Sequence, residues 1–247
     1  MTNPFSLEGK TVLVTGASSG IGRAVALACA GMGASVIVNG RNRERLESVL
    51  AQLEGNGHSL IAGDLTLSGD VERISDSVPS LDGVVHCAGI GHRNMCKFLE
   101  SEEIDSVMNT NFKSAVSLQT ALQTAKKLRK GGSIVFMASR AATTPSIGNA
   151  VYSAAKGAMI SYSKCLGLEL APQRIRVNCI CPAMVWTDLI LQGGVDKETL
   201  AEEEKKYPLG RYGKPEDIAW LAVYLLSDAS GWMTNSCIDI TGGSLTL

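Results

Sequence analysis

Tyr152 and Lys156 stand four residues apart in the stretch YSAAK. At this spacing two side chains lie on the same face of a helix, so the lysine ammonium would be close to the tyrosine hydroxyl. A free tyrosine keeps its proton up to about pH 10, and a nearby positive charge lowers that pKa toward the range in which acid–base catalysis is efficient. Tyrosine–lysine pairs are also common on helix surfaces, so the pair alone fits either catalysis or a structural role.

A glycine-rich turn near the N-terminus is the second feature of the sequence that could have a chemical role. Gly16, Gly20 and Gly22 lie between a β-branched run at 11–15 and a helical pattern. Without side chains, the backbone amides and the helix N-terminus can approach a pyrophosphate. Three glycines would also suit a plain tight turn, but their place in the first strand–helix unit predicts a dinucleotide site.

The end of the second expected strand predicts which dinucleotide binds. An acidic residue there would bind the ribose 2′-hydroxyl, whereas an arginine accommodates a 2′-phosphate. Gly40 stands where the acid would be and Arg41 follows, with no carboxylate before Glu44. This favours NADP(H), with NAD(H) as the alternative. The other interpretation is that Arg41 and Arg43 begin a solvated helix.

Alternating strands and helices must position these residues. Short β-branched runs alternate with helical patterns, and several runs are apolar at nearly every position, as in parallel strands covered on both faces. The alternation predicts one doubly wound, Rossmann-like α/β domain over 1–247, with a mainly parallel sheet and helices on both faces. The expected strands are 11–15, 35–39, 59–63, 83–87, 133–137, 176–180 and 236–240.

Two helical patterns and one irregular stretch complete the layout. Ser101 is expected to cap a long helix. The stretch 187–214 breaks the rhythm and is interpreted as a substrate lid, with a solvated helix as the alternative. The segment 217–226 is apolar almost all round, and such a helix needs cover on more than one side. We expect part of that cover to come from a second subunit.

Composition excludes several classes of function. The chain has 247 residues, 45% of them hydrophobic, and a formal net charge of -1. Without a basic block, a signal-peptide pattern or a long apolar run, we expect no nucleic-acid partner and no membrane association. Seven cysteines scattered through apolar segments indicate reduced thiols in the cytoplasm. His86, Cys87, His92 and Cys96 are close together, but their spacing differs from structural zinc sites, so no metal is expected.

Over its whole length the chain resembles the short-chain dehydrogenase/reductase family. The resemblance implies a Ser–Tyr–Lys site, supported by an asparagine, that transfers a hydride between a nicotinamide and a carbonyl carbon or carbinol. The matching motifs, in order, are TGASSGIG (15–22), Asp64 in AGDLT, HCAG (86–89), Asn111 in NTNF, Ser139 in FMASRAA, Tyr152 and Lys156 in YSAAK, and CPAMVWT (181–187).

The resemblance also implies a role for each site residue. Tyr152 would be the acid that protonates the developing alkoxide, and Ser139 would hydrogen-bond the same oxygen. Lys156 would hold the ribose hydroxyls and tune Tyr152, and Asn111 would anchor a water that links Lys156 to solvent. The implied cofactor contacts are Gly16, Ser18, Ser19, Gly20, Ile21, Gly22, Arg41, Asp64, Leu65, Ala88, Gly89, Tyr152, Lys156, Pro182, Val185 and Thr187.

Two features depart from the family pattern. His86 and Cys87 stand where asparagines are usual, which puts the hydrogen bonds that brace the central strands in doubt. Ala183 stands where glycine is frequent after Pro182, which adds a methyl group beside the nicotinamide.

Within the family, 3-oxoacyl-thioester reductases of fatty-acid synthesis are the most similar in length and layout. A basic stretch at 126–130 would then face an acidic acyl carrier protein, although cations at a helix C-terminus are favourable on their own. The alternatives are a sugar, polyol or other small-alcohol dehydrogenase and, in a different class, a non-catalytic dinucleotide-binding regulator. The resemblance implies a homotetramer or a homodimer.

Overall fold

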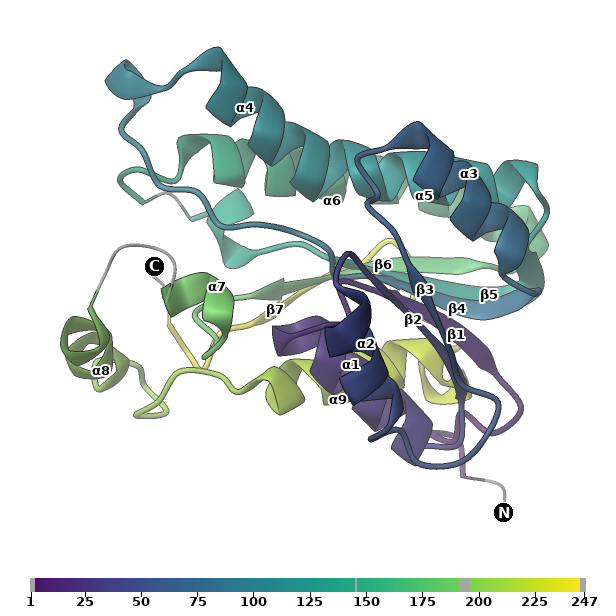
Figure 1. Ribbon diagram of the computed structural model, residues 1–247. Coiled ribbons are helices and arrows are strands. Elements are labelled where there is room, and N and C mark those ends of the chain that lie inside the picture. Colours follow the sequence, from purple (N-terminus) through teal and green to yellow (C-terminus); the bar gives the residue numbers. More distant parts are fainter. Residues whose placement is uncertain (1–2, 145, 192–195, 245–247) are drawn as a thin grey trace.

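The computed structural model describes residues 3–144, 146–191 and 196–244, which form a sheet between two layers of helices (Figure 1). The 7-stranded sheet has the order β3-β2-β1-β4-β5-β6-β7, and each neighbouring pair is parallel. The prediction of a doubly wound parallel sheet is confirmed. The strands are β1 (Thr11–Thr15), β2 (Ser35–Gly40), β3 (Ser59–Ala62), β4 (Leu81–His86), β5 (Leu128–Met137), β6 (Arg176–Pro182) and β7 (Cys237–Ile240).

Helices cover both faces of the sheet. In Figure 1, α1, α2 and α9 lie on one side and α3, α4, α5 and α6 on the other. The helices are α1 (Gly20–Gly31), α2 (Arg43–Leu50), α3 (Ser68–Ser77), α4 (Ser101–Met108), α5 (Ser114–Thr124), α6 (Ala150–Leu170), α7 (Asp188–Leu191), α8 (Lys197–Glu204) and α9 (Pro215–Leu226), with a π-helical turn η2 (Asn109–Lys113) and short 3₁₀ turns η1 (Cys96–Phe98), η3 (Arg140–Ala142), η4 (Ala171–Gln173) and η5 (Asp228–Ser230).

The central strand β1 shows why its sequence is apolar without alternation. Val12 and Val14 point into the core shared with α1 and α9. Leu13 points to the opposite face and packs with residues of α3 and α5. Both faces exclude water, so the three central positions of the strand carry apolar side chains without alternation.

Two expected boundaries shift in the structure. β5 begins at Leu128 rather than at 133, because Leu128 pairs with Leu81 ahead of an irregularity in the β4–β5 register. Ser101 is the first residue of α4 rather than its cap. The cap is Glu100, whose backbone N–H donates to the Glu103 carboxylate (3.0 Å) in a reciprocal capping box.

The basic stretch at 126–130 is also placed differently from the prediction. α5 ends at Thr124, so the stretch follows the helix instead of closing it. Lys127 donates to the backbone oxygens of Asp76 (3.0 Å) and Val78 (2.8 Å). Arg129 pairs with Asp82 at 2.9 Å. These two cations therefore hold the start of β5 within the fold.

The stretch 187–214 forms α7 and α8, which lie beyond the carboxyl ends of β6 and β7 (Figure 1). α8 is tied to the fold because the Trp186 indole donates to Glu204 (2.8 Å) and Leu200 is buried. Residues 192–195 of the expected lid lie outside the described residues. Within the described ranges, no helix combines the length and hydropathy that a bilayer crossing requires.

Candidate active site

The predicted site residues gather at one edge of the sheet. Gly16 follows β1, Gly40 ends β2, Asp64 follows β3, Ser139 follows β5 and Pro182 ends β6. Because the strands are parallel, their carboxyl ends meet along this edge. The chain moves from β1 outward to β3 and then crosses back to β4, so the edge contains the crevice where ligands bind in doubly wound folds.

The glycine-rich turn has no room for side chains. Gly16 has φ +63°, and a Cβ there would lie 2.8 Å from the Ala88 Cα. A Cβ on Gly22 would collide with the backbone oxygen of Gly16. Gly20 begins α1, and a Cβ on it would lie 3.2 Å from the Thr187 methyl group. The turn therefore presents backbone and the helix N-terminus to a phosphate, with Ala88 and Thr187 close beside it.

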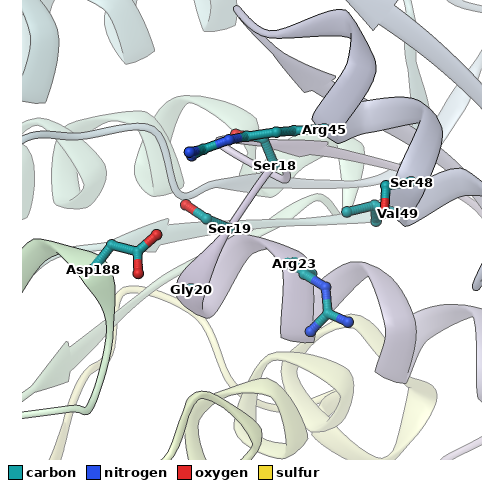
Figure 2. Close-up of a pocket in the computed structure, with 8 residues that line it drawn as sticks. All are labelled: Ser18, Ser19, Gly20, Arg23, Arg45, Ser48, Val49 and Asp188. Atoms are coloured by element: carbon teal, nitrogen blue, oxygen red, sulfur yellow. The ribbon is translucent and has the colours of Figure 1, made fainter.

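A cavity of about 270 Å³ opens in front of this turn (Figure 2). The Ser19 hydroxyl lines it and makes no capping bond to α1. Figure 2 shows Arg45 extending over Ser18, with Asp188 on the opposite side. The space and the donors fit the phosphates of a dinucleotide. The lining residues are Ser18, Ser19, Gly20, Arg23, Arg45, Ser48, Val49 and Asp188.

Ser139 and Tyr152 are brought together from β5 and α6. Ser139 caps η3, where its hydroxyl accepts the Ala141 N–H at 3.1 Å. Tyr152, in the first turn of α6, is hydrogen-bonded to Ser139. Burial raises the pKa of Tyr152, and the bond with Ser139 opposes that rise. The structure thus brings the two hydroxyl groups together from β5 and α6.

Lys156 lies one turn further along α6. Its ammonium donates to the Met137 backbone oxygen (2.8 Å) and lies 5.7 Å from the centre of the Tyr152 ring. Burial lowers the pKa of Lys156 to about 8. In the polypeptide by itself, burial is the largest influence on the phenol and raises the pKa of Tyr152. The expected lowering of that pKa by the ammonium and the nicotinamide stays a prediction.

Asn111 is buried in η2, and both ends of its amide are engaged. Its Oδ1 accepts the Ile90 N–H (2.7 Å) and its Nδ2 donates to the Ile90 oxygen (2.9 Å). A Cβ on Gly89 would lie 2.7 Å from the Asn111 Oδ1 and 3.6 Å from the Lys156 Nζ. Asn111 therefore lies beside Lys156 and fixes the segment after β4. Its role in a water relay stays a prediction.

The other predicted cofactor residues lie around the same edge. Asp64 accepts bonds from the backbone and the hydroxyl of Thr66 through one carboxylate oxygen. Leu65 and Val185 are buried, and Ile21 packs partly against the core. Arg41 is exposed and does not line the cavity over the phosphate turn.

The two residues that depart from the family pattern at the end of β4, His86 and Cys87, make contacts with the neighbouring strands and with α5. His86 stacks on Phe136, with ring centres 4.7 Å apart, and its Nε2 lies 3.2 Å from the Gln119 Oε1. The Thr15 hydroxyl accepts the N–H groups of Cys87 (3.1 Å) and Ala88 (3.2 Å). Sequence analysis missed Thr15 and Gln119. Thr15 lies within the glycine-rich motif, but its link to the segment after β4 is not visible in the sequence.

Ala183 retains the backbone pairing at the end of β6, because its N–H donates to the Ile240 oxygen at 3.1 Å. In the part of the chain that the structure describes, no group of three or more His, Cys, Asp or Glu residues could hold a metal ion.

This fold and site define an oxidoreductase class, and the chain belongs to the short-chain dehydrogenase/reductase family. The family model described as enoyl-(acyl carrier protein) reductase matches residues 16–244. Enzymes of this class act on CH–OH and C=O groups.

Individual relatives differ in their substrates. The chain is 34% identical to a 3-oxoacyl-(acyl-carrier-protein) reductase of Chlamydia pneumoniae, over 97% of this chain and 98% of the relative. It is 33% identical to a tropinone reductase homolog of Arabidopsis thaliana, over 97% and 93%. A putative NAD(P)-dependent gluconate 5-dehydrogenase of Beutenbergia cavernae with bound NADP is 31% identical, with a TM-score of 0.89 over 98% of each chain.

Proposed function

We propose that this protein is an NADP(H)-dependent carbonyl reductase whose substrate is a 3-oxoacyl thioester. The observation that carries the proposal is the hydrogen-bonded Ser139–Tyr152 pair with Lys156 on the same helix face, at the edge that also holds the phosphate turn.

In the proposed reduction, Tyr152 and Ser139 both act on the carbonyl oxygen of the substrate. NADPH, when bound, supplies the hydride to the carbonyl carbon. The Tyr152 Oη donates its proton to the carbonyl oxygen as negative charge develops there. The Ser139 Oγ donates a hydrogen bond to the same oxygen and stabilises that charge. The raised pKa of Tyr152 keeps the phenol protonated near neutral pH, so the acid is ready for reduction.

The surroundings favour an aliphatic acceptor. Ile147, in the loop before α6, is 82% exposed. A Cβ on Gly91 would lie 3.4 Å from the Leu189 side chain, which brings α7 against the segment after β4. Exposed apolar side chains such as Ile147 and Leu189 suit an acyl chain better than a polyol. The 3-oxoacyl-(acyl-carrier-protein) reductase among the relatives supports the same substrate class.

We also propose that the thioester substrate is carried by an acyl carrier protein. Because Lys127 and Arg129 are engaged within the fold, only Lys126 and Lys130 of the basic stretch are available for an acidic partner. The free state of all seven cysteines fits a reducing compartment, and we propose the cytoplasm.

A small hydroxy acid is the second candidate substrate. Arg93 approaches the loop before α6, where its guanidinium lies 3.4 Å from the Ile147 oxygen. An exposed cation at this loop would bind a carboxylate. The gluconate 5-dehydrogenase title of a similar structure supports this candidate.

The test is the loss of reduced-cofactor absorbance with acetoacetyl thioester and NADPH, compared with NADP⁺ reduction by gluconate. We expect turnover of the thioester, and Tyr152→Phe should lower kcat by about 10²- to 10⁴-fold while the NADPH Kd stays within about threefold. Tyr162→Phe, on the same helix, is the matched control and should keep full activity. Turnover of gluconate alone would select the second candidate. Full turnover in Tyr152→Phe would contradict the role of Tyr152 as the proton donor.

We also propose that the chain assembles as a homodimer or homotetramer through the surface around α9. The inner side of α9 packs on α1, but Trp220 on its outer side is 56% exposed. Trp232 is 103% exposed just before β7, the last strand of the sheet order. Exposed indoles and an open strand edge each favour contact with a second subunit.

A further inference from the structure

Two cysteines are neighbours across the last two strands of the sheet. Cys179 of β6 and Cys237 of β7 are direct partners in the parallel register, and both are free thiols. We propose that they form a reversible, peroxide-reactive site, in which Cys237 is oxidised first and Cys179 then closes an intramolecular disulfide with it. This site goes beyond the proposed reduction, because neither thiol takes part in that reaction.

The register of the two strands brings the thiols within bonding range. Neighbouring strands lie about 4.8 Å apart, and a disulfide requires Cα atoms about 4.4–6.8 Å apart. The Cys179 N–H donates to the Ser236 oxygen at 2.8 Å, which holds the strands together at this point. Cys179 belongs to the core under α6, whereas Ile238 packs against the core shared with α9. Because successive side chains of a strand alternate, Cys237 points to the same face as Cys179.

Cys237 has the exposure and the ionisation of an attacking thiol. It is exposed, whereas Cys179 is fully buried, so a dissolved peroxide reaches Cys237 first. The hydrogen bond with Cys179 lowers the pKa of Cys237 to about 7, and burial opposes this effect. The Lys164 ammonium also lowers that pKa, and the Asp239 carboxylate raises it. A substantial share of Cys237 is therefore thiolate at neutral pH, and the thiolate is the form that peroxide oxidises.

Cys179 has the properties of the second, resolving thiol. The hydrogen bond with Cys237 and burial both raise the pKa of Cys179, so this thiol keeps its proton. Its Sγ lies 3.0 Å from the Ser163 Oγ in the buried layer under α6. Cys179 is thus shielded from a dissolved oxidant and lies next to the sulfur that is oxidised first.

The proposed chemistry uses hydrogen peroxide as the oxidant. The Cys237 thiolate attacks one peroxide oxygen, an S–O bond forms, the O–O bond breaks, and the leaving hydroxide takes a proton from solvent to become water. The Cys179 Sγ then attacks the Cys237 sulfur of this sulfenic acid. The S–S bond forms, the S–O bond breaks, and the hydroxyl group leaves as water with the Cys179 proton. Two thiols are oxidised to a disulfide, and one peroxide is reduced to two waters.

The test maps thiols after oxidation of the folded, reduced chain. The chain is treated with hydrogen peroxide, the remaining thiols are alkylated, and the peptides are identified by mass spectrometry with and without reduction by dithiothreitol. We expect a Cys179–Cys237 peptide that dithiothreitol separates. Cys237→Ser should slow the loss of thiols by at least about tenfold. Cys165→Ser, which removes an exposed cysteine of α6, is the matched control and should oxidise like the wild type.

A second variant separates the two steps. Cys179→Ser should stop at the sulfenic acid of Cys237, which dimedone traps, because the resolving thiol is missing. Since Cys179 is buried, the exposed Cys237→Ser remains decisive if Cys179→Ser does not fold.

Three outcomes would overturn the inference. A covalent dimer linked through Cys237 would show that the partner thiol comes from a second chain. Equal oxidation of Cys96, Cys165 and Cys237 would show that exposure alone decides reactivity. A Cys179–Cys237 link that forms only in urea would show that the folded chain does not bring the two sulfurs together for reaction.

Discussion

His86 is a titratable residue in a buried environment. It is buried at the end of β4, where its Nε2 contacts Gln119 and its Nδ1 has no partner among the described residues. Burial lowers the pKa of His86 to about 4, because a charged imidazole would lose its hydration without gaining an acceptor. The residue is therefore neutral in the folded protein at physiological pH.

This burial predicts a pH dependence of stability. The unfolded histidine titrates near 6.5 and the folded one near 4, so the unfolded state binds more protons between these values. Stability present above pH 6.5 is lost as the pH falls toward 4, by about 3 kcal/mol in total and about 2 kcal/mol at pH 5. Urea unfolding of the wild type and of His86→Gln at pH 7.5 and pH 5 measures this difference. Equal losses in both proteins would contradict the assignment.

At the scale of secondary-structure elements, the decisive junction joins η2 to the segment after β4. The π-helical turn presents the Asn111 amide to both polar groups of the Ile90 backbone. Through this contact the α4–α5 layer fixes Gly89, which adjoins the Lys156 ammonium. A change in η2 should therefore alter the surroundings of the Lys156 ammonium.

Asn111→Ala should lower the free energy of unfolding by about 2 kcal/mol, because it leaves a backbone donor and an acceptor without their partners. The measurement is chemical unfolding, accompanied by the NADPH Kd as a readout of the Gly89 segment. Asn109→Ala, in the same turn but without a side-chain hydrogen bond in the described ranges, is the matched control. Indistinguishable unfolding midpoints for the two variants would show that the hydrogen bonds between Asn111 and Ile90 do not stabilise the fold.

At the scale of the whole molecule, β7 is the edge strand at the opposite end of the sheet from β3. Trp220 on α9 and Trp232 just before β7 are both exposed, and these two side chains with the free edge of β7 make up the α9–β7 surface of the proposed assembly. The proposed assembly buries this surface. Trp220→Glu should shift the protein toward a smaller species, because the interface would have to bury an unpaired carboxylate. Light scattering after size-exclusion chromatography measures the mass. Leu67→Glu, an exposed apolar position on a different face, should leave the mass unchanged, and a shift in both variants would point to general destabilisation.

Local patterns in the sequence determined the framework. Apolar runs such as 11–15 require cover on both faces, and their alternation with helices favours a parallel doubly wound sheet, which the structure confirms. The glycine-rich turn was also predictable, because the sequence shows directly which of its residues are glycines without side chains. The order of the family motifs predicted that Ser139, Tyr152 and Lys156 belong to one site, without knowledge of any contact between them.

Tertiary structure decided what depends on contacts between distant segments. Arg45 lines the cavity because capping by Asn42 and the burial of Leu46 set the rotation of α2, which no spacing rule gives. Lys127 and Arg129 resemble a docking surface in the sequence but are held by the α3–β4 region in the fold. The Tyr152 pKa depends on burial by the surrounding chain. The sequence by itself thus determined the strands, the phosphate turn and the chemical groups, because local periodicity and residue type encode them. Packing decided which cations are free, which are paired and in which direction each pKa shifts. The reason is that desolvation and ion pairing depend on which distant atoms become neighbours.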